Sequence, residues 1–448
     1  MKAKLHLDDK KAISSLSKSA IEVTTAGLKP YLKRSIWIGK SNHYAHDVVR
    51  KLKKQPANAT QRRQLAQYIS ASICLHANDG WSYLGRSISC LLAGDMHRAL
   101  HLAYYAELRA AMSLLASTGI GIFNTKHFVI SAANSTTKLK SGAGTHVAAW
   151  IALEQWCRLR ASGAMFATII RPEGRTLEEW FQPHGGAAAL APQARNWFMQ
   201  WGMDLGFASK DRDARNESSY RPDGVPTLWG ISPAENLRFV REMWATLEPS
   251  SASGFEQIDR YILRIALERL YLGRHGRVAS PADPTFVGFI NATLLNQGFS
   301  SSAEDRLRRF LLRQASPNDP EFFAYSAAKP ANADADAFAV LSRALLLLRT
   351  ATGSAQMLVQ KVGVDSDMLS FWWTQLGEAR GLWQTGSPPD SLSDLWADVQ
   401  QSLDELDNIE THDPGAFQSA NSVAFGMQGL LNVFTSHERV GLWGLFPA

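Results

Sequence analysis

ALHLAYYAELRAAMSLL, residues 99–115, is the stretch that best predicts the fold of this 448-residue chain. Its larger apolar side chains recur at spacings of three and four: Leu100, Tyr104, Leu108, Ala111, Met112 and Leu115. On a helix of 3.6 residues per turn, this spacing stacks the side chains into one apolar stripe. We therefore predict a central helix that turns this stripe toward a hydrophobic core and ends near Gly119.

A second stripe on the same predicted helix is polar. His97, His101, Tyr105 and Arg109 recur every four residues, so their side chains line up along one edge of the helix. An otherwise apolar helix that carries such a row is typical of the wall of a cleft. We treat His101, Tyr105 and Arg109 as candidate binding residues.

Length and composition indicate an ordinary globular protein, because 45% of the residues are hydrophobic and 20% are charged. A chain of this length usually exceeds one core, so we expect a basic domain at residues 1–250 and an acidic, Trp-rich domain at 255–448. No run of 18 apolar residues occurs, and the first residues lack the apolar segment of a secretory signal. We therefore expect a cytoplasmic protein with no membrane association.

Charge is distributed unevenly along the chain. Residues 1–250 carry an excess of 13 positive charges, whereas the remainder carries an excess of 7 negative charges. A basic half attracts polyanions, which makes RNA a candidate partner. A solvated basic surface, or a basic domain docked on an acidic one, explains the asymmetry more simply, because the lysines are spread over several segments and no basic run is interleaved with aromatics.

The order of patterns along the chain predicts a mostly α-helical fold. A helix from about residue 58 to 74 is followed by a break at Asn78–Gly80 and by a second helix to residue 93. Residues 122–132 form a short extended piece, and residues 137–145 a basic loop. Ser232 and Glu235 around Pro233 are typical of a helix start. Further helices are expected at 255–273, 283–296, 302–314, 334–350, 367–377, 390–406 and 416–437.

A short polar motif, ARNESSYRP, follows the predicted helices of the basic half at residues 214–222. Together with YYAELRAAMSLLAS at 104–117, Gly119, Gly121 and His127, it resembles the HEPN superfamily of helical prokaryotic proteins. The resemblance covers roughly residues 60–250, and the chain is also similar to the YaaC-like bacterial proteins. The resemblance to the HEPN superfamily implies a bacterial protein of a defence or stress system, such as antiphage defence or a toxin–antitoxin pair.

The resemblance also implies a chemistry, metal-independent RNA cleavage by an arginine and a nearby histidine. The arginine stabilises charge on the phosphoryl oxygens and the histidine transfers a proton. Arg215 and Asn216 match this pattern, but Tyr220 stands at the histidine position. A phenol titrates near pH 10, against about 6.5 for imidazole, so Tyr220 is a poor base. We therefore expect a degenerate site that binds RNA or an accessory protein, with Asn216 among the binding residues.

Two alternatives remain open at this point. In the first, the protein is an active ribonuclease that uses Arg215 with Tyr220 or His127, and His101 or His97 are further proton-transfer candidates. In the second, the motif is a loop pinned by its arginine, and the chain is a helical interaction scaffold with no nucleic-acid role. Helices of this family type commonly pair across a two-fold axis, so we also expect a homodimer.

The remaining patterns carry less information about function. His97 and His101 have the spacing of a metal-ligand pair, but no third ligand accompanies them, so we expect neither a metal nor a cofactor. Arg264, Arg269, Arg274 and Arg277 are expected on exposed turns at the end of a helix, where cations suit the helix dipole.

Overall fold

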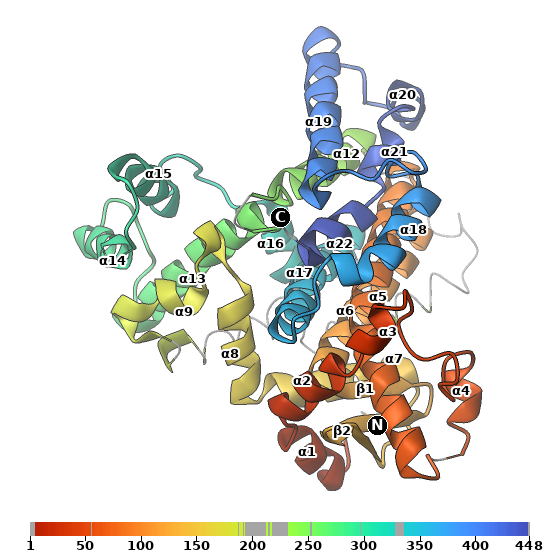
Figure 1. Ribbon diagram of the computed structural model, residues 1–448. Helices are drawn as coiled ribbons and strands as arrows, with labels where there is room; N and C mark the ends of the chain where they lie inside the picture. The colour runs from red at the N-terminus through yellow and green to blue at the C-terminus, as the bar shows by residue number, and fades with distance from the viewer. Residues whose placement is uncertain are drawn as a thin grey trace.

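The computed structural model describes residues 5–54, 56–186, 188–190, 192, 212–213, 216, 232–250, 253–295, 297–327 and 336–446 (Figure 1). Within this part of the chain the fold is mostly α-helical, as predicted, with one small sheet. The helices of the first half are α1 (Leu7–Ser14), α2 (Lys18–Ala26), α3 (Lys29–Leu32), α4 (Val48–Lys51), α5 (Ala59–Leu92), α6 (Met96–Ser117), α7 (Thr145–Cys157), α8 (Arg160–Ile169), α9 (Leu177–Trp180) and α12 (Pro233–Thr246).

The second half is also helical. Its helices are α13 (Glu256–His275), α14 (Pro284–Leu294), α15 (Ser301–Leu311), α16 (Glu321–Ala327), α17 (Ala337–Lys361), α18 (Ser370–Arg380), α19 (Leu395–His412), α20 (Ala420–Gly426), α21 (Leu431–Phe434) and α22 (Glu438–Leu445). In Figure 1, α14 and α15 extend to one side of the molecule and α19 extends upward.

Helices α5 and α6 form an antiparallel hairpin around which the other elements pack. The Ser87 hydroxyl donates to Ala99 O, and the Ser113 hydroxyl donates to Ile73 O, so the two helices run in opposite directions. The apolar stripe of α6 is largely buried, with Tyr104 and Leu115 fully inside the core. Helix α6 ends at Ser117, and Gly119 follows with φ 90°, a conformation that favours glycine.

The predicted break at Asn78–Gly80 is wrong, because α5 continues through these residues as one helix of 34 residues. Gly80 serves close packing between helices instead of a turn. A Cβ atom at this position would lie 2.5 Å from Leu348 Cδ2 on α17 and 3.3 Å from Ala106 O on α6. Glycine therefore lets three helix backbones approach one another here.

The sheet follows α6 directly. Strands β1 (Ile120–Phe123), β2 (Lys126–Ala132) and β3 (Ser135–Lys138) are antiparallel in the order β1-β2-β3, with Ile122 opposite His127. The extended piece expected at residues 122–132 is thus confirmed, but β3 occupies the start of the predicted loop at 137–145.

The helix start predicted at Ser232 is confirmed. Ser232 caps α12, where its hydroxyl oxygen accepts the N–H of Glu235 at 3.4 Å. Asp283 and Ser300 cap α14 and α15 in the same way, through the N–H groups of Thr285 and Ala303. None of the helices in the described part of the chain combines the length and apolar character that a membrane span requires.

Packing joins the two halves of the chain. Helix α17, from the expected acidic domain, packs against both α5 and α6, and α22 packs against α5 and α17. Trp81 Nε1 donates to Thr352 Oγ1 at 2.9 Å across this contact. Helices from both expected domains therefore contribute to one buried cluster, and the boundary expected at residues 250–255 does not mark a gap in the core.

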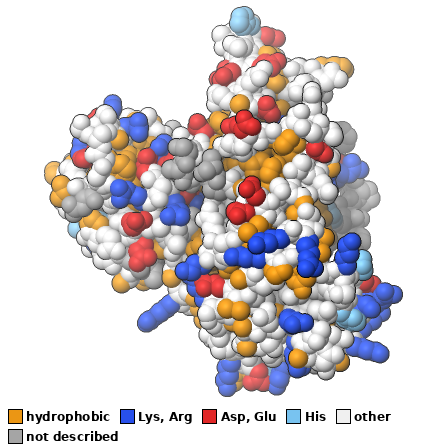
Figure 2. Space-filling model, viewed as in Figure 1, with side chains coloured by type: hydrophobic (Ala, Val, Ile, Leu, Met, Phe, Trp, Pro, Cys, Tyr) orange, Lys and Arg blue, Asp and Glu red, His pale blue; other side chains and the backbone are white. Residues whose placement is uncertain are grey.

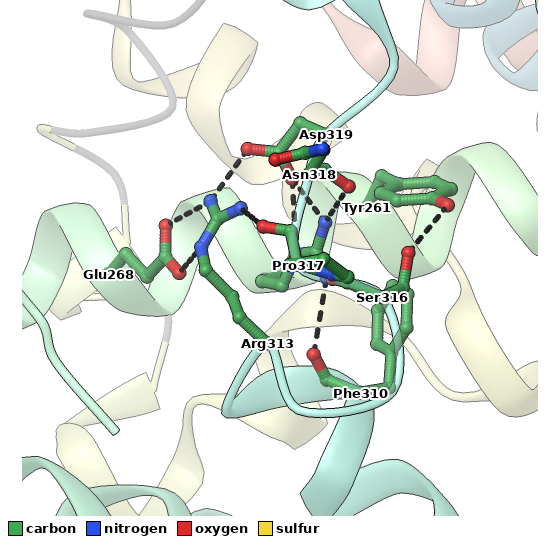
Figure 3. Close-up of polar contacts among 9 residues, drawn as sticks. Tyr261, Glu268, Phe310, Arg313, Ser316, Pro317, Asn318 and Asp319 are labelled. Atoms are coloured by element: carbon green, nitrogen blue, oxygen red, sulfur yellow. Dashed lines mark hydrogen bonds and ion pairs between the residues drawn. The ribbon is translucent and has the colours of Figure 1, made fainter. Parts of the chain in front are cut away.

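Arg264 corrects the expectation of an exposed cationic helix end. Its side chain is fully buried on α13, and its Nη2 contacts Asp319 Oδ1 at 2.5 Å and Asn318 O at 2.8 Å. Arg313, from the turn after α15, binds Glu268 and Asp319 in the same cluster (Figure 3). The side chain of Arg264 thus anchors the loop between α15 and α16 to α13. Arg274 and Arg277 are exposed, as expected, whereas Arg269 is only partly exposed.

Candidate functional site

The polar row of α6 is half-buried along its whole length. His97, His101, Tyr105 and Arg109 are all partly exposed, as their spacing predicts. The row starts just after Asp95, whose carboxylate caps the helix by accepting the N–H of Arg98. It faces side chains of α5 and, at its middle, the first turn of α7.

Arg109 is held by two residues of α5. Its Nη1 lies 3.0 Å from His76 Nδ1 and 3.7 Å from Asp79 Oδ2. Burial, with the nearby Arg109 charge, lowers the pKa of His76 to about 3, so the imidazole is neutral and accepts a hydrogen bond from the guanidinium. Burial raises the pKa of Asp79, and Arg109 opposes that change. The Arg109 charge is thus largely engaged within the protein.

Aromatic rings occupy the middle of the row. Tyr105 stacks on Tyr83 of α5 with ring centroids 5.5 Å apart, and the ring of His101 lies 5.1 Å from Tyr105. The adjacent Tyr104 is buried, and its hydroxyl lies 3.2 Å from His146 Nδ1. The Trp150 indole N–H donates to the same hydroxyl at 3.3 Å. Tyr105 and His101 therefore belong to an aromatic contact between α5, α6 and α7.

His127 has a backbone partner for each ring nitrogen. The side chain is buried on β2, where Nδ1 accepts the N–H of Phe123 at 3.3 Å and Nε2 donates to Ala143 O at 2.8 Å. Burial lowers the pKa of the imidazole, which favours this neutral form. His127 thus ties the β1–β2 hairpin to the loop before α7. Within the described residues, no hydrogen bond or ion pair joins it to the α6 row.

The arginine–tyrosine motif is only partly described. Arg215 and Tyr220 lie outside the described residues, so their position relative to α6 remains a prediction. Asn216 is described, with a helical backbone and a partly exposed side chain. Among the described residues, no group of three or more His, Cys, Asp or Glu side chains is arranged to hold a metal ion.

A basic surface near the N-terminus does not follow from the helical spacing of the α6 row. Residues 29–63 hold ten Lys and Arg against one acidic residue, Asp47. Eight of these cations are exposed, and we define them as the basic surface: Lys33, Arg34, Lys40, Arg50, Lys51, Lys53, Lys54 and Arg63. Figure 2 shows Lys and Arg side chains gathered on the side of the molecule where Figure 1 places α3 and α4.

Ion pairing leaves most of this charge available. Among the described residues, one ion pair involves a cation of the basic surface: Arg50 Nε lies 3.1 Å from Asp47 Oδ2. The other cations lie in the segment between α3 and α4, at the end of α4, in the turn after it, and in the first turns of α5.

Comparison with known proteins gave no match: no family model, no curated protein and no solved structure is significantly similar to the chain.

Proposed function

We propose that the protein binds RNA through the basic surface and does not cleave it. The observation that carries the proposal is the clustering of eight exposed cations around a single acidic residue in residues 29–63. Phosphates are the natural partners of such a surface, because each Lys or Arg that contacts the backbone releases a condensed counterion. The proposal retains a HEPN-like bacterial protein of a defence or stress system, in which the cleavage site is degenerate.

Binding is favoured over cleavage by the state of the candidate catalytic groups. General acid–base catalysis requires a side chain whose proton can reach the substrate. Both nitrogens of His127 are engaged by backbone groups, and Arg109 already contacts His76 and Asp79. An active ribonuclease based on Arg215 and Tyr220 would need a proton acceptor beyond these residues.

Salt dependence tests the proposal directly. A fluorescein-labelled single-stranded RNA of mixed sequence is titrated with the protein by anisotropy, in chelator, at several salt concentrations. Each phosphate contact that is lost from a single strand reduces the slope of log K against log salt by about 0.7. We therefore expect Lys53→Glu with Lys54→Glu to weaken binding and to reduce the slope by about 1.4 or more.

A charge-matched variant provides the control. Arg306→Glu with Lys361→Glu changes the net charge equally at two exposed cations outside the basic surface. This variant should retain the parental slope. An equal loss of RNA affinity in the two double variants, or no RNA binding by the parent, would contradict the proposal. RNA cleavage by the parent in chelator would contradict the part of the proposal that excludes catalysis.

A further inference from the structure

A small open cavity lies between the C-terminal end of α6, the start of α2, and helices α8 and α17. Its volume is about 240 Å³. One wall is a face of α8 on which Ala161, Ala164, Met165 and Thr168 follow one another at helical spacing. Ala161 and Ala164 are exposed there, and Met357 and Leu358 of α17 also line the cavity. The helices thus leave an apolar recess open to solvent.

The hydroxyl groups in this cavity are satisfied within the protein. Ser117 donates to Leu114 O at 2.7 Å, and its hydroxyl lies 2.6 Å from that of Ser354. Thr118 donates to Leu115 O at 2.8 Å. Because these hydroxyl groups already have protein partners, the cavity favours an apolar ligand over a polar one. The two methionines, Met165 and Met357, have flexible side chains that can adjust to its shape.

The charge of Lys18 at the rim of the cavity favours a ligand with an anionic end. Lys18 is the only charged residue among the lining residues, all of which are described, and its side chain is exposed. Within the described part of the chain, Lys18 forms no ion pair. Its ammonium group can therefore contact an anion at the rim while an apolar chain fills the recess. The volume of the cavity corresponds to about eight water molecules at roughly 30 Å³ each. A ligand with about eight non-hydrogen atoms in its chain would fill this volume.

We propose that this cavity binds a short unbranched carboxylate, with its alkyl chain between α8 and α17 and its head at Lys18. Lys18 is not part of the basic surface, so this site is independent of RNA binding. A carboxylate is favoured over a neutral amphiphile because the only charged lining group is a cation. The chain length is favoured by the volume of the recess.

Calorimetric titration of the full chain tests the site with defined probes. Hexanoate, octanoate, octanol and octylamine are compared. Two added methylenes should tighten binding by about 15-fold while the recess still has room. Octanoate should bind more tightly than octanol, and octylamine most weakly. Lys18→Met should weaken octanoate by about fivefold and leave octanol unchanged.

Two matched tryptophan variants separate occupancy of the cavity from unspecific effects. Ala164→Trp fills the recess and should weaken octanoate at least tenfold. Ala397→Trp makes the same change at an exposed position of α19 and should have no effect. Circular dichroism confirms that both variants fold. The proposal is overturned if octanoate does not bind the parent, if both tryptophan variants bind it equally well, or if octanol binds as tightly as octanoate.

Discussion

The buried ion pair between Asp259 and Arg349 provides a quantitative test of the core of the second half and of its contact with the first. Asp259 lies on α13 and Arg349 on α17, and their side chains are 0% and 3% exposed. The guanidinium binds both carboxylate oxygens, with distances of 2.8 Å from Nε and 2.6 Å from Nη2. The same side chains also contact the first half: Arg349 Nη2 donates to Ile169 O, and Asp259 Oδ2 accepts the N–H of Arg171.

Asp259→Asn removes the negative charge and leaves the shape of the side chain almost unchanged. The Arg349 charge then remains buried without its counterion, a situation that costs about 3–5 kcal/mol. An exposed pair gives the matched control. Asp305 and Arg309 lie 3.1 Å apart with side chains 53% and 57% exposed. Asp305→Asn should therefore cost less than about 1 kcal/mol.

Urea unfolding followed by circular dichroism measures the free energies of unfolding of the Asp259→Asn and Asp305→Asn variants. We also expect Asp259→Asn and Arg349→Met to be non-additive, because the second change removes the charge that the first leaves unpaired. The double variant should be about 1–3 kcal/mol more stable than the sum of the single effects predicts. If Asp259→Asn costs no more than Asp305→Asn, the buried pair does not stabilise the core more than an exposed pair does, and the proposed role of this pair in the core is refuted.

Three further predictions concern single residues. Gly80→Ala should destabilise the protein by about 1–3 kcal/mol, because the new Cβ meets Leu348, whereas Gly273→Ala, with open space around it, should be neutral or stabilising. His127→Ala should cost about 2–4 kcal/mol by leaving two backbone groups without partners, yet leave RNA affinity unchanged. The pKa of the buried His437 is lowered by burial to about 3, below the 6.5 of an unfolded chain, so the unfolded state takes up the proton first as the pH falls. Stability should therefore fall between pH 6.5 and 3, by roughly 1.4 kcal/mol per pH unit from this group, and His437→Phe should remove that share.

Urea unfolding serves for the stability measurements, at pH 7 for the glycine and His127 variants and from pH 7 to 4 for His437→Phe. Equal effects of the two glycine substitutions would contradict the close approach of α5 to α17. An unchanged stability for His127→Ala would show that its backbone contacts contribute little. A His437→Phe variant that keeps the parental pH slope would place the titration elsewhere.

Features that depend on neighbouring residues could be predicted from the sequence. The serine at position 232, followed by Pro233 and Glu235, satisfies the first turn of α12 locally, and the helix begins there. The row from His97 to Arg109 follows from helical spacing alone. The prediction of a mostly α-helical chain rests on the same short-range periodicity.

Features that depend on distant partners could not be predicted in this way. Gly80 has the local chemistry of a turn, but the approach of Leu348, far along the chain, makes it a packing position inside α5. Arg264 follows the pattern of an exposed cation, but Asp319, 55 residues away, accounts for its burial. The net charge of the first half was evident, whereas the gathering of eight cations on one surface depends on how α3, α4 and α5 are placed.

Mapping of the RNA contact tests the central claim most directly. The protein is bound to a single-stranded RNA that contains 4-thiouridine, cross-linked with ultraviolet light, digested and analysed by mass spectrometry. We predict that the cross-linked peptides come mainly from residues 29–63, and that Lys53→Glu with Lys54→Glu removes most of them. Cross-links that lie mainly outside this segment, or that persist in the variant, would contradict RNA binding by the basic surface.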